Sequence, residues 1–274
     1  MSDQATHLPS LDPGMAPAGT YQDRYPMYAS TVGGTCVRVV TPSSGTPPAC
    51  GLPWIWRAEF LGAFDDADRA LLDAGWHLVQ VDVPDRYGDP VSMAAWWSAY
   101  RTLVDEFGFH PRPGLIALSR GGLYAIAWAS DHPECVSAIY LDNAVCDLRS
   151  WPGGRPHGYG RGTGAPEQWQ EMLNVFGFGP DDSDALAAAS PISKLAPLAT
   201  ARIPLLVVYG DSDQVVPAEE NSEVLVSRYA ALGGPSTSII RPGADHHPHS
   251  IDDAHGGPTV VSEFFESARR NHTS

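Results

Sequence analysis

Residues 113–122 read Pro-Gly-Leu-Ile-Ala-Leu-Ser-Arg-Gly-Gly, and this stretch decides how the rest of the chain is interpreted. Its apolar run, 114–118, predicts a short buried strand, and the apolar residues that follow the glycines predict a helix. Ser119 lies between the two with small residues two positions away on either side, Ala117 and Gly121. A sharp strand-to-helix turn pushes a serine hydroxyl outward and tolerates only small neighbours, so the pattern predicts a nucleophilic serine. A serine before two glycines would also suit an ordinary turn and helix cap.

The composition and charge narrow the range of partners. The chain has 274 residues, 43% of them hydrophobic and 18% charged, as is typical of a soluble globular protein. Its net charge of −15 argues against nucleic acid and anionic membranes, which need clustered Lys and Arg. Neither a secretory signal nor a run of ~18 apolar residues is present. We expect a cytoplasmic protein acting on a small-molecule substrate, with no nucleic-acid or membrane partner and an undetermined oligomeric state.

Strands and helices alternate along most of the chain. A polar leader rich in Pro and Gly, 1–20, is expected to be flexible and to precede one domain over 21–270. The predicted strands are 25–31, 35–41, 52–56, 77–83, 114–118, 136–141, 205–209 and 236–240, and the predicted helices are 66–74, 93–107, 123–130, 218–231 and 260–269. This alternation predicts an α/β fold with a mostly parallel sheet of about eight strands and helices on both faces.

One segment interrupts the alternation. Residues 148–200 separate two core strands by far more chain than one crossover helix needs, and they include a predicted helix over 166–176. We interpret this insertion as a lid or binding loop, although a surface excursion without function would have the same length.

Two further motifs follow predicted strands. Gly-Asp-Ser-Asp-Gln-Val-Val-Pro, 210–217, follows one buried strand, and Pro-Gly-Ala-Asp-His-His-Pro-His, 242–249, follows the last. Because the carboxyl ends of parallel strands share one edge of the sheet, Asp213 and His246 should lie at the same edge as Ser119.

The chain order Ser119, Asp213, His246 resembles the nucleophile, acid and base order of the α/β-hydrolase superfamily over about residues 25–270. The chain is most similar to small esterases related to dienelactone hydrolases and to prolyl-oligopeptidase catalytic domains. Ala117 departs from the usual G-x-S-x-G pattern.

The resemblance implies a role for each residue. His246 would take the proton from the Ser119 hydroxyl, and Asp213 would hold the imidazole in the required tautomer. The backbone N–H groups of Arg120 and Arg57 would form the oxyanion hole, although the usual His-Gly pair is missing after the third strand. No cofactor is implied.

Several neighbouring residues compete for these roles. Asp211 could replace the acid and His247 the base, although Asp211 fits a turn cap and His247 would point its ring elsewhere. The three histidines 246, 247 and 249 could also form a metal cluster, but no spaced partner supports a metal site.

Aromatic residues are candidates for substrate contact. Trp56 could line a pocket, although tryptophans at such spacings are more often core, whereas Trp151 and Tyr159 lie in a Gly-rich stretch with little core to bury them. Four cysteines are expected to be free thiols, with a Cys36–Cys50 or Cys135–Cys146 disulfide left open.

We therefore expect a serine carboxylic-ester hydrolase that forms an acyl-enzyme on small, acetyl-type esters of a neutral small molecule or carbohydrate. An acyltransferase, lactonase, thioesterase or peptidase would use the same three residues. A non-catalytic binding protein on a hydrolase fold is a third alternative, disfavoured because candidates for all three residues are present.

Overall fold

The computed structural model describes residues 14–43 and 51–273, so residues 1–13 of the expected leader and the residue Cys50 lie outside the described part. Within it, nine strands form one sheet: β1 (Ala16–Tyr21), β2 (Tyr25–Val32), β3 (Thr35–Val40), β4 (Trp54–Arg57), β5 (His77–Val81), β6 (Gly114–Leu118), β7 (Ala138–Asp142), β8 (Leu205–Gly210) and β9 (Ser236–Arg241). The longer helices are α1 (Asp66–Asp73), α2 (Pro90–Phe107), α3 (Gly121–Asp131), α4 (Pro166–Phe176), α5 (Ser183–Ala189), α6 (Leu195–Thr200), α7 (Ser222–Ala231) and α8 (Thr259–Thr273).

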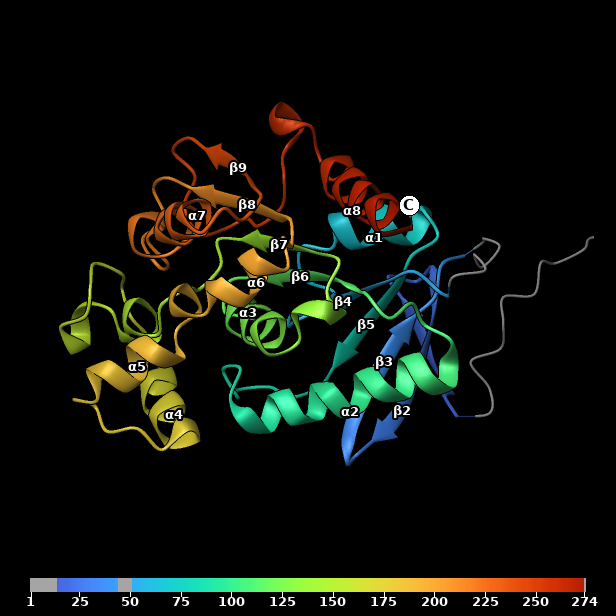
Figure 1. Cartoon of the computed structure of the whole chain (residues 1–274), viewed down its shortest axis with the longest axis horizontal. Coiled ribbons are helices and arrows are strands. Elements are labelled where there is room, and N and C mark those ends of the chain that lie inside the picture. The colour runs from blue at the N-terminus through green and yellow to red at the C-terminus, as the bar shows by residue number, and fades with distance from the viewer. Residues whose placement is uncertain (1–13, 44–50, 274) are drawn as a thin grey trace, which may run out of the picture.

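The strand order across the sheet is β1-β2-β3-β5-β4-β6-β7-β8-β9 (Figure 1). The pairs β1–β2, β2–β3 and β3–β5 are antiparallel, and every pair from β5 to β9 is parallel. The predicted mostly parallel sheet is therefore confirmed. Because the parallel strands end at one edge, the segments that follow β4, β6, β7, β8 and β9 meet there.

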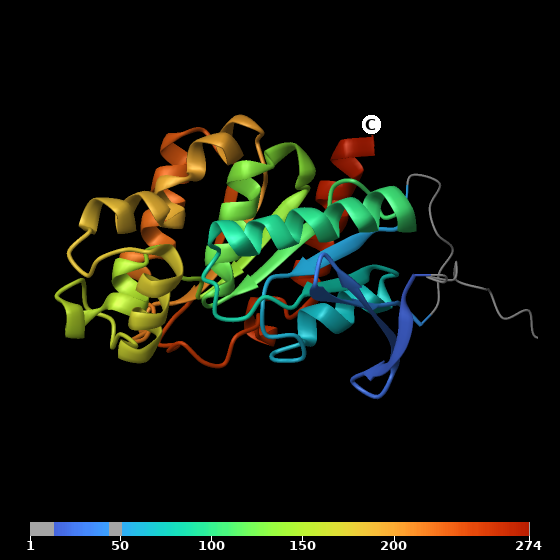
Figure 2. The same ribbon diagram turned by 90° about the horizontal axis from the view of Figure 1, so that it is seen from below.

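Helices cover both faces of the sheet, as predicted (Figures 1 and 2). The apolar residues of α1 and α8 pack on one face, and those of α2, α3, α6 and α7 pack on the other. Strands β6, β7 and β8 are buried along their whole length because they lie between these two layers, which explains their nearly continuous apolar sequences.

Local signals fix the ends of the long helix α2. The Asp89 side chain accepts a hydrogen bond from the Ser92 N–H at 2.9 Å, and Pro90 occupies the first turn. Gly108 ends the helix in the left-handed conformation at φ 71°. The helix therefore begins three residues before the predicted start at Met93, because the cap lies outside the apolar pattern.

The structure differs from the expected leader at residues 16–20, which form most of β1. This strand pairs with β2, is exposed along most of its length and changes register between Pro17 and Thr20. Its polar sequence shows no apolar alternation because neither face of this edge strand is covered. Strand β1 accounts for the ninth strand.

The insertion 148–200 is built from α4, α5, α6 and shorter turns. The predicted helix is present as α4, and α4 and α5 lie at one end of the molecule, away from α1 and α8 (Figure 1). Helix α6 packs on α3 and α7, so it supplies the crossover between β7 and β8. The additional chain is therefore the part before α6.

Among the described helices, none is long and apolar enough to cross a membrane. Cys36, Cys135 and Cys146 carry free thiols, so the Cys135–Cys146 disulfide does not form. The alternative Cys36–Cys50 pair involves a residue outside the described part.

Candidate active site

The turn between β6 and α3 holds Ser119 in the left-handed region at φ 48°. A non-glycine residue in this conformation is strained and marks functional turns. The Ser119 N–H donates to the Asp142 carbonyl at 3.0 Å, which ties the turn to the end of β7. A Cβ atom at Gly121 would lie 3.3 Å from the Ala58 Cβ atom, tighter than most such contacts. The glycine two positions after the serine thus lets the loop after β4 approach the turn.

Ser119, His246 and Asp213 come together although they are far apart in the sequence. The Ser119 Oγ atom lies 3.0 Å from His246 Nε2, and His246 Nδ1 lies 2.7 Å from Asp213 Oδ2. The imidazole and the carboxylate are both buried, with relative exposures of 4%. Ser119, His246 and Asp213 thus form a hydrogen-bonded series of a hydroxyl, a base and an acid that orients the base, and we call these three residues the triad.

Asp213 and its neighbour Asp211 have different hydrogen-bond partners. The second oxygen of Asp213 accepts hydrogen bonds from the N–H groups of Val215 and Val216, both at 2.8 Å. The Asp211 carboxylate instead accepts from the Gly243 N–H and stabilises the turn after β9. The turn after β8, residues 211–217, which we call the acid turn, therefore presents Asp213 to the imidazole. Asp211 stabilises this turn against the turn after β9.

The neighbouring histidines have other partners. His247 is exposed, and its ring stacks on Phe64 at 5.4 Å between centroids. His249 is buried, and its Nδ1 atom lies 3.1 Å from Asp142 Oδ1. Ligand atoms of His246, His247 and His249 lie within 4.8 Å of one another. Both ring nitrogens of His246 already contact Ser119 and Asp213, so a metal ion could take one only by breaking this series.

Asn143, which directly follows β7, is a site residue that the sequence reasoning missed. Its side-chain N–H donates to the His246 carbonyl at 2.8 Å, and its side-chain oxygen accepts from the Gly210 N–H at 2.9 Å. It also adopts a left-handed conformation at φ 43°. One buried amide thus joins the loop that carries the histidine to the strand that precedes the acid. Its position after a buried strand was the available signal.

Asp142 also holds the loop after β9, which carries His246. Its buried carboxylate accepts hydrogen bonds from the Tyr140 hydroxyl at 2.7 Å and from the Ser250 N–H at 2.7 Å, and it contacts His249 and Arg241. Burial alone would raise the pKa of Asp142, but the contacts with His249 and Arg241 outweigh it and hold the pKa below its ordinary value. An ionised carboxylate therefore fixes the loop that follows β9.

The structure places Arg57 differently from the expected oxyanion donor. Arg57 ends β4, and the next N–H, of Ala58, donates to the Ile116 carbonyl of β6 at 3.0 Å. Successive N–H groups of a strand point to opposite neighbours, so the Arg57 N–H faces β5, away from Ser119. Its buried guanidinium pairs with Asp68 of α1 at 3.1 Å and braces the fold.

Glu59 offers a better placed N–H group. This N–H and that of Arg120 have no acceptor within the described residues. A Cβ atom at Gly121 would lie 3.8 Å from the Glu59 nitrogen, so the Glu59 amide is next to the serine turn. The geometry therefore favours Arg120 and Glu59 as the pair of donors, in place of Arg120 and Arg57.

No protein-family model matches this sequence, and no curated protein matches it either. Among solved structures, a truncated carbohydrate esterase from gut microbiota is similar with a TM-score of 0.66 at 16% identity, over 91% of this chain and 99% of that one. A puromycin-hydrolysing peptidase of Mycobacterium tuberculosis is similar with a TM-score of 0.64 at 17% identity, over 92% of this chain and 37% of that one. The chain has the α/β-hydrolase fold. An acylaminoacyl peptidase of Pyrococcus horikoshii gives a TM-score of 0.62 at 14% identity, over 92% of this chain and 49% of that α/β-hydrolase. The chain spans between about a third and a half of the length of these two peptidases.

One of the residues predicted to contact substrate, Trp56, lies in the core of the α/β-hydrolase fold. Trp56 is fully buried and stacks on Trp96 at 4.2 Å between ring centroids, with Trp128 beside it. The prediction that Trp56 contacts substrate is therefore wrong, because its strand is covered by α2 and α3. Aromatic burial of this kind stabilises the core.

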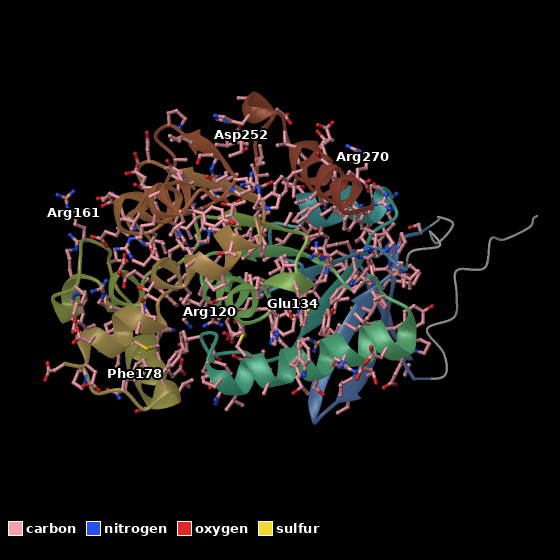
Figure 3. All side chains as sticks on the ribbon, viewed as in Figure 1. Arg120, Glu134, Arg161, Phe178, Asp252 and Arg270 are labelled. Carbon is pink, nitrogen blue, oxygen red and sulfur yellow. The ribbon has the colours of Figure 1, made fainter. Side chains whose placement is uncertain are left out.

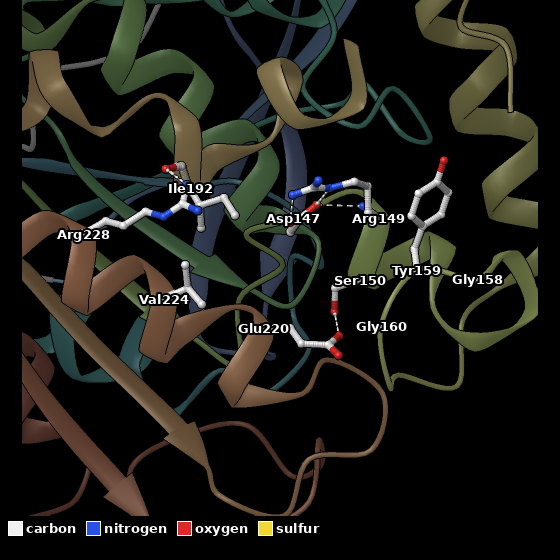
Figure 4. A pocket seen from close by; sticks show the side chains of 10 residues that line it. All are labelled: Asp147, Arg149, Ser150, Gly158, Tyr159, Gly160, Ile192, Glu220, Val224 and Arg228. Atoms are coloured by element: carbon white, nitrogen blue, oxygen red, sulfur yellow. Dashed lines mark hydrogen bonds and ion pairs between the residues drawn. The ribbon is translucent and has the colours of Figure 1, made fainter. Parts of the chain in front are cut away.

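Trp151 and Tyr159 lie in the insertion. Trp151 is half-buried, and its ring lies 6.3 Å from that of Tyr87, which in turn lies beside the Arg120 guanidinium. Tyr159 lines a different cavity of about 390 Å³ between the insertion and α7. Figure 4 shows that cavity, where Arg149 pairs with Asp147 and the Ser150 hydroxyl donates to Glu220. Trp151 is therefore linked to the serine turn through Tyr87 and Arg120, whereas none of Ser119, Asp213 and His246 lines the Tyr159 cavity.

Arg120 (labelled in Figure 3) is held beside the serine by two carboxylates. Its Nε atom donates to Glu59 at 2.6 Å, and its guanidinium pairs with Asp85 at 2.8 Å. Burial raises the pKa of Glu59 to about 7, although the nearby Arg120 opposes this rise. The charge next to the serine turn therefore changes near neutral pH.

Replacing Glu59 by Gln should remove a pH dependence of stability. Because the pKa of the folded protein lies above the ordinary value of 4.5, the neutral carboxyl stabilises the fold fully below pH 4.5, and this contribution is lost as pH rises through about 7. Relative to Glu59→Gln, the wild-type free energy of unfolding should fall by about 3 kcal/mol across this window. Urea unfolding at a series of pH values measures it. Glu219→Gln, at an exposed position, is the control, and parallel curves for wild type and Glu59→Gln would contradict the assignment.

Proposed function

We propose that this chain is a serine carboxylic-ester hydrolase that acts through an acyl-enzyme intermediate. The observation that carries the proposal is the series from Asp213 through His246 to the Ser119 hydroxyl, with contacts of 2.7 and 3.0 Å. A serine hydroxyl is a weak nucleophile without such a base, and an imidazole needs a partner that fixes its tautomer.

The geometry supports the following sequence of steps. His246 Nε2 takes the proton from Ser119 Oγ as this oxygen bonds to the carbonyl carbon of the ester. The N–H groups of Arg120 and Glu59 stabilise the oxyanion, and each such donor is worth about 3–4 kcal/mol. The intermediate collapses, the C–O bond to the alcohol breaks, and His246 returns the proton to the leaving alcohol. Water, activated by the same imidazole, then releases the acid and restores the Ser119 hydroxyl.

A small acyl group on a neutral alcohol, such as a carbohydrate, is the proposed substrate class. A cavity of about 180 Å³ lies beside Arg120, and the charged and amide side chains in its lining suit a polar, uncharged alcohol part of the ester. The similarity to a carbohydrate esterase along nearly its whole length is consistent with this class.

A substrate panel tests the proposal against the alternatives that share the triad. We expect p-nitrophenyl acetate and an acetylated sugar to give a burst of product and steady turnover, with p-nitrophenyl octanoate much slower. Faster cleavage of a prolyl anilide than of any ester would indicate a peptidase, and preference for a lactone, a thioester or an alcohol acceptor would indicate those activities instead. A protein that hydrolyses none of these compounds and is not labelled by a fluorophosphonate would be a binding protein, contrary to the proposal.

A further inference from the structure

Two cavities lie next to each other between the loop after β4 and the end of β5. The inner one, of about 180 Å³, is lined by Glu59, Phe60 and Arg120 among others. The outer one, of about 470 Å³, extends to the turn after β1. Gln80 and Asp82 line both, so the two cavities share a wall. Together they reach the size of small-molecule sites, ~300–1,000 Å³. We call this combined feature the β5 groove.

The inner end of the β5 groove lies at the serine turn. Arg120 directly follows Ser119, and Glu59 carries the second N–H group proposed for the oxyanion. A substrate whose ester carbonyl occupies the oxyanion position therefore has one side next to the inner cavity. The outer end lies beside Tyr21 and Gln22, which gives the bound molecule room to extend toward the edge of the sheet.

The floor of the outer cavity is a fixed polar array. Arg38 donates to the Gln80 side-chain oxygen at 3.1 Å and to Asp82 Oδ2 at 3.0 Å. The Gln80 amide N–H groups and Asp82 Oδ1 have no hydrogen-bond partner within the described part of the chain, and both Arg38 and Asp82 are about one-third exposed. The Gln80 amide thus offers hydrogen-bond donors and the neighbouring Asp82 carboxylate offers an acceptor. This combination suits hydroxyl groups, because each hydroxyl can both donate and accept.

The inner cavity adds an aromatic face. The Phe60 side chain is 39% exposed, and the Arg120 guanidinium lies 5.4 Å from the centre of its ring. An exposed ring held by such a contact offers an apolar surface to the C–H face of a sugar ring. Glu59, Asp82 and Asp85 together carry more negative charge than Arg38 and Arg120 can neutralise when all are ionised, which disfavours an anionic ligand.

We propose that the β5 groove binds the alcohol part of the substrate and that this part is an uncharged, extended carbohydrate. The inference rests on the proposed esterase function and names the leaving group that this site would accept. The sugar that carries the acyl group lies at Ser119, a neighbouring ring lies over Phe60, and a further ring contacts Arg38, Gln80 and Asp82.

Kinetics with two substrates test the groove. For Arg38→Ala, kcat/KM for an acetylated β-1,4-linked tetrasaccharide should fall at least tenfold more than kcat/KM for p-nitrophenyl acetate, mainly through KM. Gln22→Ala, at another residue that lines the outer cavity, should act in the same direction. Arg24→Ala is the control, because Arg24 forms a comparable exposed ion pair with Asp73 outside the groove and should leave both substrates unaffected. Equal losses for both substrates, or no loss for either, would overturn the proposal.

A binding measurement separates failure of the groove from failure of the esterase function. In the Ser119→Ala protein, calorimetric titration with the unacetylated tetrasaccharide should show binding that Arg38→Ala weakens at least tenfold. If wild type hydrolyses p-nitrophenyl acetate but the tetrasaccharide does not bind, the groove proposal is wrong and the esterase function stands. If the tetrasaccharide binds and no ester is cleaved, the groove stands and the proposed function is wrong.

Discussion

Replacing Ser119 by Ala should lower kcat for p-nitrophenyl acetate by about 10⁴–10⁶. The variant lacks the atom that bonds to the acyl carbon, and His246 then has no hydroxyl to deprotonate. What remains is the weaker catalysis by the oxyanion donors and by substrate binding. Stopped-flow measurement of p-nitrophenol release gives both the burst and the steady rate, and we expect the burst to disappear.

Labelling provides an independent measurement of the same change. A tagged fluorophosphonate should modify Ser119 in wild type, identified by mass spectrometry of the labelled peptide, and should leave Ser119→Ala unmodified. Ser212→Ala is the matched control, because Ser212 is exposed in the acid turn and contacts Asp211 instead of the imidazole. Hydrolysis that persists in Ser119→Ala at the wild-type rate would refute the nucleophile assignment.

Asp213→Asn should lower kcat by about 10⁴ while leaving the fold intact. Asp213 Oδ2 accepts a hydrogen bond from the N–H group at His246 Nδ1, which leaves Nε2 free to accept the Ser119 proton. An amide nitrogen at this position would favour the opposite tautomer, in which Nε2 carries the proton and cannot act as a base. Steady-state kinetics with p-nitrophenyl acetate measure the loss, and circular dichroism checks the fold.

Asp211→Asn is the control for this experiment. Its carboxylate accepts from the Gly243 N–H and has no contact with His246 among those described, so we expect a loss of less than tenfold. If Asp211→Asn were as inactive as Asp213→Asn, the assignment of the acid would fail.

The strands and helices that pack on both sides could be predicted because burial leaves a period in the sequence. β6 and β8 are continuous apolar runs, and the structure confirms both as buried strands. Strand β1 could not be predicted in this way, because it is held by backbone hydrogen bonds to β2 and both of its faces are exposed. Trp56 was ambiguous for the opposite reason: a tryptophan in a buried strand and one in a pocket look alike in sequence.

The convergence of Ser119, Asp213 and His246 could be predicted because each follows a strand and parallel strands end at one edge. The residues whose roles depend on where a backbone N–H group or a side chain points could not be predicted. Whether the Arg57 or the Glu59 N–H faces Ser119 is decided by which neighbouring strand takes each hydrogen bond, and this depends on the order β5-β4-β6. The role of Asn143 depends on the end of β8 and on the loop that carries His246, which lie 67 and 103 residues away in the chain.

Asn143 has a consequence for how a protein with this site can diversify. Its single amide sets the spacing between the acid strand and the histidine loop, and the adjacent Asp142 carbonyl receives the Ser119 N–H. The distances between Ser119, His246 and Asp213 thus depend on two residues, Asp142 at the end of β7 and Asn143 directly after it. The loops after β1 and β5 and the insertion that contains α4 and α5 lie outside this junction. Substitutions in these segments can therefore change the surfaces around the site while Ser119, His246 and Asp213 keep their relative positions.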